Sequence, residues 1–375
     1  MRRRNPPSAA ARVGKIAAVA VVAGTLLAAV AGGLLRAGIA WPAQLDAPLA
    51  GQAAVAHAAL MMSGFLGTVI GIERAVAVKL RWAWLVPLCA ALGSALALAG
   101  RSEAAVGYAL ASCVFVGVNV VVVRRQKEAH TALLLVGALA WFVGNLAFAA
   151  GARSEAVFAW WFAFLVVTIA AERLEMTRLM QRHPSAQLGL LVTVAALLLG
   201  ALLSGLWPQA GGVLYGTALA AVALWLGVFD IARRTALAHG LSRYMAVCLL
   251  AGYAWLGVAG AAWAAMALGA PSRDLALHAL GLGFIVSMVM GHAPVILPAV
   301  ARVKLHFGRW FYAPLALLHL SLVLRLGAGF ADNGWRSMGA SLNALALLLF
   351  AATLAGSALA WRRLNATPPL SHRTP

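Results

Sequence analysis

Four histidines stand inside apolar stretches of this sequence that are long enough to cross a lipid bilayer: His57, His278, His292 and His319. A polar side chain is costly at membrane depth, so each of them is a candidate for function. At neutral pH an unperturbed imidazole is mostly uncharged and offers a nitrogen lone pair, which can ligate haem iron, copper or zinc. Met61, one helical turn after His57, adds a thioether sulfur, a soft ligand for copper. These residue types indicate a haem or metal site within a membrane.

Two of the histidines, His278 and His292, share the stretch 275–298. Fourteen residues at about 100° per residue return to within about 40° of the starting direction, so both imidazoles lie on one face of a helix. They would lie about 21 Å apart along its axis, one near each side of the membrane. This spacing resembles that of b-type cytochromes, in which one helix carries two histidines for two haems. The position fourteen after His57, however, is Gly71, which has no ligating atom.

The depths of these side chains, counted from the predicted outer end of each helix, match for three of them and differ for His319 and His292. At about 1.5 Å per residue, His57, His278 and Arg325 lie about 5–6 Å deep. On the same scale His319 lies about 15 Å and His292 about 26 Å deep. Two imidazoles at one depth on separate helices could clamp a haem axially, or hold copper with a methionine sulfur, and His319 or His292 would be a further ligand. Snorkelling of a long side chain to the interface accounts for Arg325 without any function.

The composition excludes a soluble globular protein. Of the 375 residues, 63% are hydrophobic and only 10% are charged, whereas charged residues make up about a quarter of soluble domains. The net charge of +19 does not indicate nucleic-acid binding, because the basic residues fall in the connections between apolar runs and not on one surface. The sequence predicts an all-α, polytopic transmembrane bundle. Its twelve helices are expected at 16–35, 52–72, 82–100, 105–123, 131–151, 156–172, 186–206, 212–231, 244–268, 275–298, 310–329 and 337–361.

The distribution of Lys and Arg predicts the orientation of this bundle. Placing the amino terminus in the cytoplasm puts 23 of the 29 Lys and Arg residues on the inner side and 6 on the outer side. This asymmetry is typical of proteins of the inner (cytoplasmic) membrane and predicts that both termini are cytoplasmic. We expect a basic tail at 1–15, a transmembrane domain at 16–361 that could divide into halves 16–183 and 184–361, and a disordered tail at 362–375. The first helix is expected to be retained, because its apolar run exceeds that of a signal peptide.

Two short stretches resemble the NnrS family of twelve-helix bacterial membrane proteins. Residues 57–65 read HAALMMSGF, which is similar to that family's signature His-x-His-Glu-Met-x-x-Gly-Phe. Residues 278–280 read HAL and begin a glycine- and methionine-rich run, similar to the family's late His-Ala-Leu helix. Ala59 and Leu60 stand where the signature has its second histidine and its glutamate.

The resemblance implies a haem or haem–copper protein connected with nitric oxide stress. It implies that His57 and His278 are cofactor ligands and that Met61 lies nearby. We therefore expect a redox or nitric-oxide-related membrane protein that contacts the lipid bilayer, with a redox partner and without nucleic acid. The sequence indicates neither an enzymatic reaction nor an oligomeric state.

Two other interpretations remain open. The same histidines could relay protons in a secondary transporter or exporter, although few acidic residues lie at membrane depth to assist them. They could instead only form hydrogen bonds to neighbouring helices, in a structural or assembly subunit. A carboxylate-rich calcium, magnesium or di-iron site is excluded because the membrane segments lack the acidic residues for it.

Overall fold

A computed structural model describes residues 9–40, 47–176 and 184–366. These residues form helices joined by short connections, and no β-strand occurs among them. The all-α fold predicted from the sequence is confirmed. The outermost parts of the two predicted tails, 1–8 and 367–375, lie outside the described residues.

Twelve helical segments in the described part of the chain are long and apolar enough to span a membrane, as predicted. The chain is therefore an integral, multi-pass membrane protein. Several spans run beyond their predicted ends. The second, Ala47–Val78, has 32 residues, and the last, Asn333–Asn365, has 33. The orientation of the termini stays a prediction.

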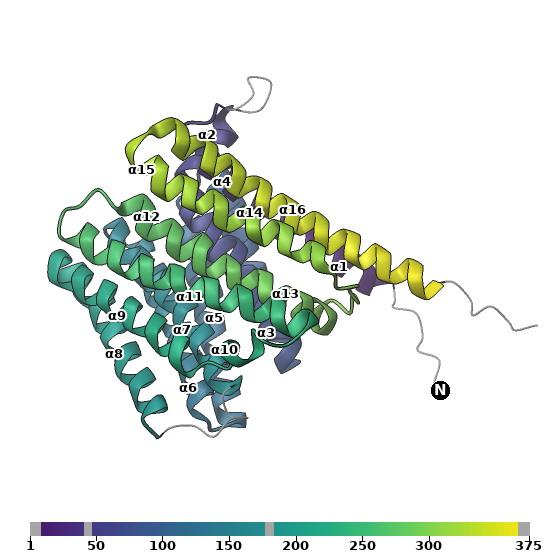
Figure 1. Ribbon diagram of the computed structural model, residues 1–375. Coiled ribbons are helices and arrows are strands. Elements are labelled where there is room, and N and C mark those ends of the chain that lie inside the picture. The colour runs from purple at the N-terminus through teal and green to yellow at the C-terminus, as the bar shows by residue number, and fades with distance from the viewer. Residues whose placement is uncertain (1–8, 41–46, 177–183, 367–375) are drawn as a thin grey trace, which may run out of the picture. The chain divides into compact units, whose positions relative to one another are not determined.

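The chain divides into two compact units, Unit 1 (1–175 with 196–215) and Unit 2 (176–195 with 216–375). Unit 1 holds α1 (Ala9–Arg36), α2 (Ala47–Ala59), η1 (Leu60–Leu66), α3 (Gly67–Val78), η2 (Arg81–Trp84), α4 (Leu85–Leu98), α5 (Ala104–Arg125), α6 (Ala129–Ala149) and α7 (Ser154–Met176) (Figure 1). The helices α8 (Pro184–Leu206) and α9 (Pro208–Phe229) each contribute to both units. Unit 2 further holds α10 (Ala232–Thr235), α11 (Gly240–Ala267), α12 (Arg273–His278), η4 (Ala279–Val286), α13 (Ser287–Val300), η5 (Arg309–Phe311), α14 (Tyr312–Val323), η6 (Leu324–Ala328), α15 (Gly329–Ala331) and α16 (Asn333–Ala366).

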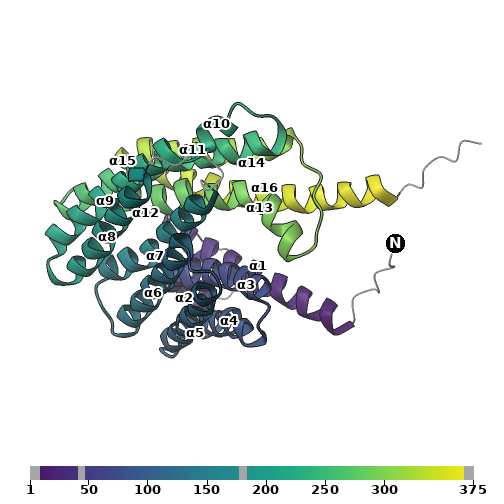
Figure 2. The same ribbon diagram turned by 90° about the horizontal axis from the view of Figure 1, so that it is seen from below.

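Neighbouring helices in the sequence pack against each other within each unit. In Unit 1, α5 packs between α4 and α6, and α1 packs along α2 (Figure 2). In Unit 2, α14 runs along α16, and α11 runs along the span made of α12, η4 and α13. Short connections favour such antiparallel pairs.

A buried polar network holds η1 in Unit 1. The Asn145 side-chain oxygen accepts hydrogen bonds from the Ser63 hydroxyl at 2.9 Å and from the Trp161 indole at 2.9 Å. Its amide nitrogen donates to the Tyr108 carbonyl and to the Ser112 hydroxyl. Because a buried polar group is costly unless it is hydrogen-bonded, this satisfied network fixes one arrangement of the helices around η1.

Three π-helical segments, η1, η4 and η6, interrupt spans that carry candidate ligands. Met61 lies in η1, His278 directly precedes η4, and Arg325 lies in η6. Single π-helical turns are rare in proteins and are frequent at functional sites. The interruptions therefore coincide with the stretches that the sequence singled out.

The two units repeat one local plan around His57 and His278. In both, the histidine is followed by a π-helical segment, then by a residue with left-handed backbone, then by a 3-10 helix that begins with Arg-Trp, and then by another span. The left-handed residues are Lys79 (φ 58°) and Arg302 (φ 56°), the two non-glycine residues with positive φ in the described chain. His57 and His278 thus occupy equivalent places in their own units.

Candidate functional site around His278

The short helix α12 brings an aspartate and a histidine to the same face. Asp274 precedes His278 by four residues, one helical turn. The Nδ1 atom of His278 lies 2.9 Å from the Oδ1 atom of Asp274 and 3.1 Å from its backbone carbonyl oxygen. Both neighbouring atoms can only accept a hydrogen bond, so Nδ1 carries the proton.

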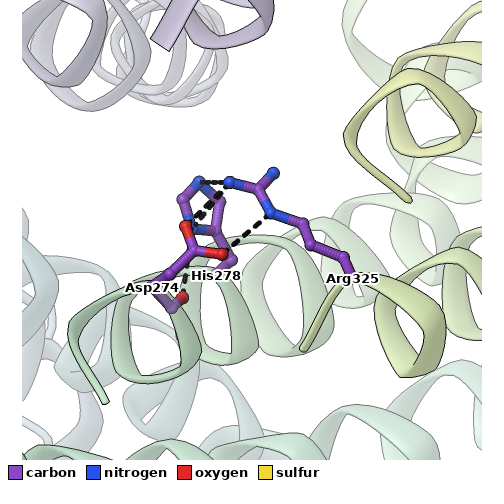
Figure 3. A network of polar contacts seen from close by, with 3 residues as sticks. All are labelled: Asp274, His278 and Arg325. Atoms are coloured by element: carbon purple, nitrogen blue, oxygen red, sulfur yellow. Dashed lines mark hydrogen bonds and ion pairs between the residues drawn. The ribbon is translucent and has the colours of Figure 1, made fainter. Parts of the chain in front are cut away.

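Arg325 completes this cluster from η6, 47 residues after His278. Its Nε lies 3.1 Å from Oδ2 of Asp274, and its Nη2 lies 2.8 Å from Oδ1 (Figure 3). This two-pronged ion pair is the strong arrangement of a guanidinium and a carboxylate. Gly339 of α16 makes the approach of the two helices possible, because a Cβ atom there would lie 2.6 Å from the Cβ of Arg325.

The guanidinium also contacts the imidazole. Nη2 of Arg325 lies 3.3 Å from Nδ1 and 3.1 Å from Nε2 of His278. Because these distances are nearly equal, Nη2 lies over the ring and not along either nitrogen's lone pair. Nη1 of Arg325 points away from both partners in Figure 3 and has no hydrogen-bond partner in the part of the chain that the structure describes.

The position of the proton decides what the imidazole of His278 can do. In the neutral ring, a proton on Nδ1 leaves the lone pair on Nε2. A histidine that donates from one nitrogen to a carboxylate and ligates through the other is the usual arrangement at metal sites. The side chain of His278 keeps 24% of its surface exposed, so a ligand can reach it.

His57 of Unit 1 is held in the same tautomer by a different partner. Its Nδ1 lies 2.6 Å from the carbonyl oxygen of Ala29 on α1. The ring lies against Gly33, where an added Cβ would stand 2.7 Å from Cε1 of the imidazole. Nδ1 of His57 therefore carries a proton, as Nδ1 of His278 does. Met61 lies four residues further along the same span, in η1, and is half-buried.

His292 shares this tautomer, whereas His319 has the opposite one. Nδ1 of His292 lies 2.7 Å from the Met288 carbonyl oxygen, one turn earlier on α13. Nδ1 of His319 accepts a hydrogen bond from the Trp255 indole at 3.0 Å. An indole N–H can only donate, so the proton of His319 is on Nε2. That buried Nε2 atom has no partner among the described residues.

The Trp255 side chain reaches His319 across η4. An added Cβ at Gly283 would lie 2.5 Å from Cγ of Trp255, so the indole passes directly over this glycine. A π-helical turn closes on residues five apart, which puts Gly283 about one turn below His278. The pair of Trp255 and His319 thus lies one layer deeper in Unit 2 than the cluster of His278.

Unit 2 therefore brings His278 and Arg325 into direct contact, as their predicted depths suggested, and places His319 in the next layer with Trp255. Within residues 9–40, 47–176 and 184–366, no three His, Cys, Asp or Glu side chains are grouped so that they could hold a metal ion. The cofactor-binding roles predicted for all six residues stay predictions: His57, Met61, His278, His292, His319 and Arg325.

Sequence reasoning missed Asp274 and Trp255. The position of Asp274 four residues before His278 was a signal that both share a helix face. Trp255 carried no such signal, because its partner His319 is 64 residues away in the sequence. Only the packing of α11 and α14 around η4 brings them together.

A search of curated proteins finds no match to this chain. The model of a protein family described as a domain of unknown function, DUF8744, matches residues 15–359 and so covers all but the ends of the chain. The chain is a member of the DUF8744 family.

Proposed function

We propose that this integral membrane protein binds haem, that His278 would hold its iron, and that its role is redox or nitric-oxide-related. The observation that carries the proposal is the hydrogen bond from Nδ1 of His278 to Asp274. It directs the lone pair to Nε2 and holds the ring in one orientation, the two properties that an imidazole ligand needs.

His57 is proposed as a haem ligand within Unit 1. It has the same tautomer as His278, through its bond to the Ala29 carbonyl oxygen. It also occupies the equivalent place before a π-helical segment. Two independent stretches that present the same nitrogen in the same way support a ligand role over a merely structural one.

Arg325 is proposed to bind a carboxylate of the haem. Its Nε and Nη2 are engaged by Asp274, whereas Nη1 is available. Haem carries two propionate groups, and arginine is well suited to carboxylates. Asp274 would then both orient the ligand and fix the guanidinium.

Haem fits the described residues better than copper held by the protein alone. A protein-only copper centre needs about three ligands, and no such group of His, Cys, Asp or Glu occurs in the described residues. A haem needs at most two protein ligands, because the porphyrin supplies the other four. When bound, haem supplies one-electron chemistry and binds small ligands such as nitric oxide.

The remaining residues would shape the surroundings of the cofactor. Trp255 and His319, one layer below His278, present an indole face and an N–H donor. His319 is therefore proposed as a hydrogen-bond donor to a bound group. Its ligation of a metal through Nε2 would require the loss of that proton.

The test is a visible absorption spectrum with metal analysis on detergent-purified protein from cells supplied with haem precursor and copper. We expect haem bands in the parent, and their loss or a shift in the His278→Ala and His57→Ala variants. His239→Ala is the matched control, because His239 is exposed in the connection before α11. A colourless, metal-free parent would overturn the proposal and direct the work to transport assays.

A further inference from the structure

The connection between α13 and α14 lies along the carboxyl-terminal end of α16. The backbone N–H of His306 donates to the carbonyl oxygen of Ser357 at 3.1 Å, and the Ser357 hydroxyl donates to the carbonyl oxygen of His306 at 2.6 Å. Ser357 is 2% exposed. This reciprocal pair fixes residues 301–308, which we call the strap, against a helix 51 residues further along the chain.

The strap presents a cation over an aromatic ring of α16. Nζ of Lys304 lies 4.9 Å from the centre of the Trp361 ring. A cation in this position is attracted by the negative face of an indole. Tryptophan is enriched where a helix leaves the membrane, because its ring is apolar and its N–H is polar.

Further basic residues stand close to Lys304 and Trp361 in the sequence, and acidic residues are absent from this part of the sequence. No acidic residue occurs between Asp274 and Asp332, and none follows Asp332. The basic residues of the strap, of η5 and of the end of α16 are exposed. We call this group the basic end of Unit 2, and its members are Arg302, Lys304, Arg309, Arg362 and Arg363.

The length of α16 allows the basic end to reach the level of the lipid headgroups. The span Asn333–Asn365 has 33 residues, whereas about 20 residues cross the hydrocarbon core. The excess is enough for the last turns of α16, drawn in yellow in Figure 1, to extend beyond that core. Trp310 and Leu364 stay 48% and 63% exposed at this end and can contact the upper parts of the acyl chains.

We propose that the basic end of Unit 2 binds the headgroup of an anionic phospholipid from the adjoining leaflet. Lys304 and Arg362 contact the phosphodiester, and the Trp361 ring packs beside it. The strap, fixed by Ser357, keeps these charges together when no lipid is bound. This site is independent of the proposed haem site, because it shares no residue with it.

The test measures thermal unfolding of the purified full-length chain in neutral detergent while phosphatidylglycerol is added. Phosphatidylcholine and inorganic phosphate are added in parallel. We expect phosphatidylglycerol to raise the melting temperature and the other two to leave it unchanged. The variant Lys304→Gln/Arg362→Gln should weaken the apparent affinity for phosphatidylglycerol by about five-fold for each removed charge.

The control variant, Arg233→Gln/Arg234→Gln, removes the same charge from α10, another exposed basic segment of Unit 2. It should respond to phosphatidylglycerol as the parent does. Ser357→Ala, which releases the strap without changing the charge, should also weaken the response. Equal responses of the Lys304/Arg362 variant and the control would overturn the proposal. Stabilisation by inorganic phosphate equal to that by phosphatidylglycerol would overturn the assignment to a lipid.

Discussion

Nδ1 of His278 lies 2.9 Å from Oδ1 of Asp274, and the same carboxylate oxygen lies 2.8 Å from Nη2 of Arg325. One carboxylate therefore sets the tautomer of an imidazole and neutralises a guanidinium within a membrane span. Asp274 therefore both orients the candidate ligand His278 and stabilises the packing of the helices that carry Asp274 and Arg325.

Asp274→Asn should weaken haem binding. An amide keeps the shape of the side chain but loses the charge that orients His278 and Arg325, and removing such a partner typically lowers affinity by about 10- to 100-fold. The measurement is a titration of the haem-free protein with haemin, followed by absorbance. Asp332→Asn, the same change at the start of α16, is the control. Identical titrations of the two variants would contradict the role of Asp274.

Arg325→Gln should lower the free energy of unfolding by about 1–3 kcal/mol, because it breaks a charge-assisted pair at a buried position. Arg325 is 8% exposed. In the double variant with Asp274→Asn, the combined loss should be smaller than the sum of the single losses, because both changes remove the same interaction. Thermal unfolding in detergent measures this cycle. Strict additivity would show that the two side chains do not stabilise each other.

Gly33→Ala should displace the imidazole of His57. The new methyl group would stand 2.7 Å from Cε1 of His57, so we expect a loss of about 1–3 kcal/mol and a changed absorption spectrum in the haem-loaded protein. Gly24→Ala, on the same helix but with open space around it, should be neutral or slightly stabilising. If both variants behave alike, the contact between Gly33 and His57 has no consequence.

Trp255→Phe should allow His319 to populate both of its neutral tautomers. The indole N–H is the donor that keeps the proton of His319 on Nε2, and its loss should cost about 1 kcal/mol. Nitrogen-15 chemical shifts of labelled histidine report the tautomer directly. We expect the parent to show the Nε2–H form and the variant to show a mixture. Trp335→Phe, at an exposed tryptophan of Unit 2, should leave the signal of His319 unchanged.

The twelve spans could be predicted from the sequence alone, because hydrophobic length is a local property and a lipid bilayer requires every span to satisfy its own backbone as a helix. The matched depths of His278 and Arg325 followed from the same regularity, since 1.5 Å per residue converts position into depth. The π-helical segments and the left-handed residue Arg302 were not predicted. They depend on how neighbouring helices pack, which no local pattern records.

The identity of the groups that face each histidine was decided by the tertiary structure. His57 bonds a carbonyl oxygen 28 residues away, and His319 accepts from an indole 64 residues away. The amino-acid sequence named His57 as a leading ligand and His319 as a further one, but residue type and depth do not distinguish the two ring nitrogens. Only the packing of one helix against another determines which nitrogen meets a donor and which meets an acceptor, and that assignment separates a candidate ligand from a hydrogen-bond donor.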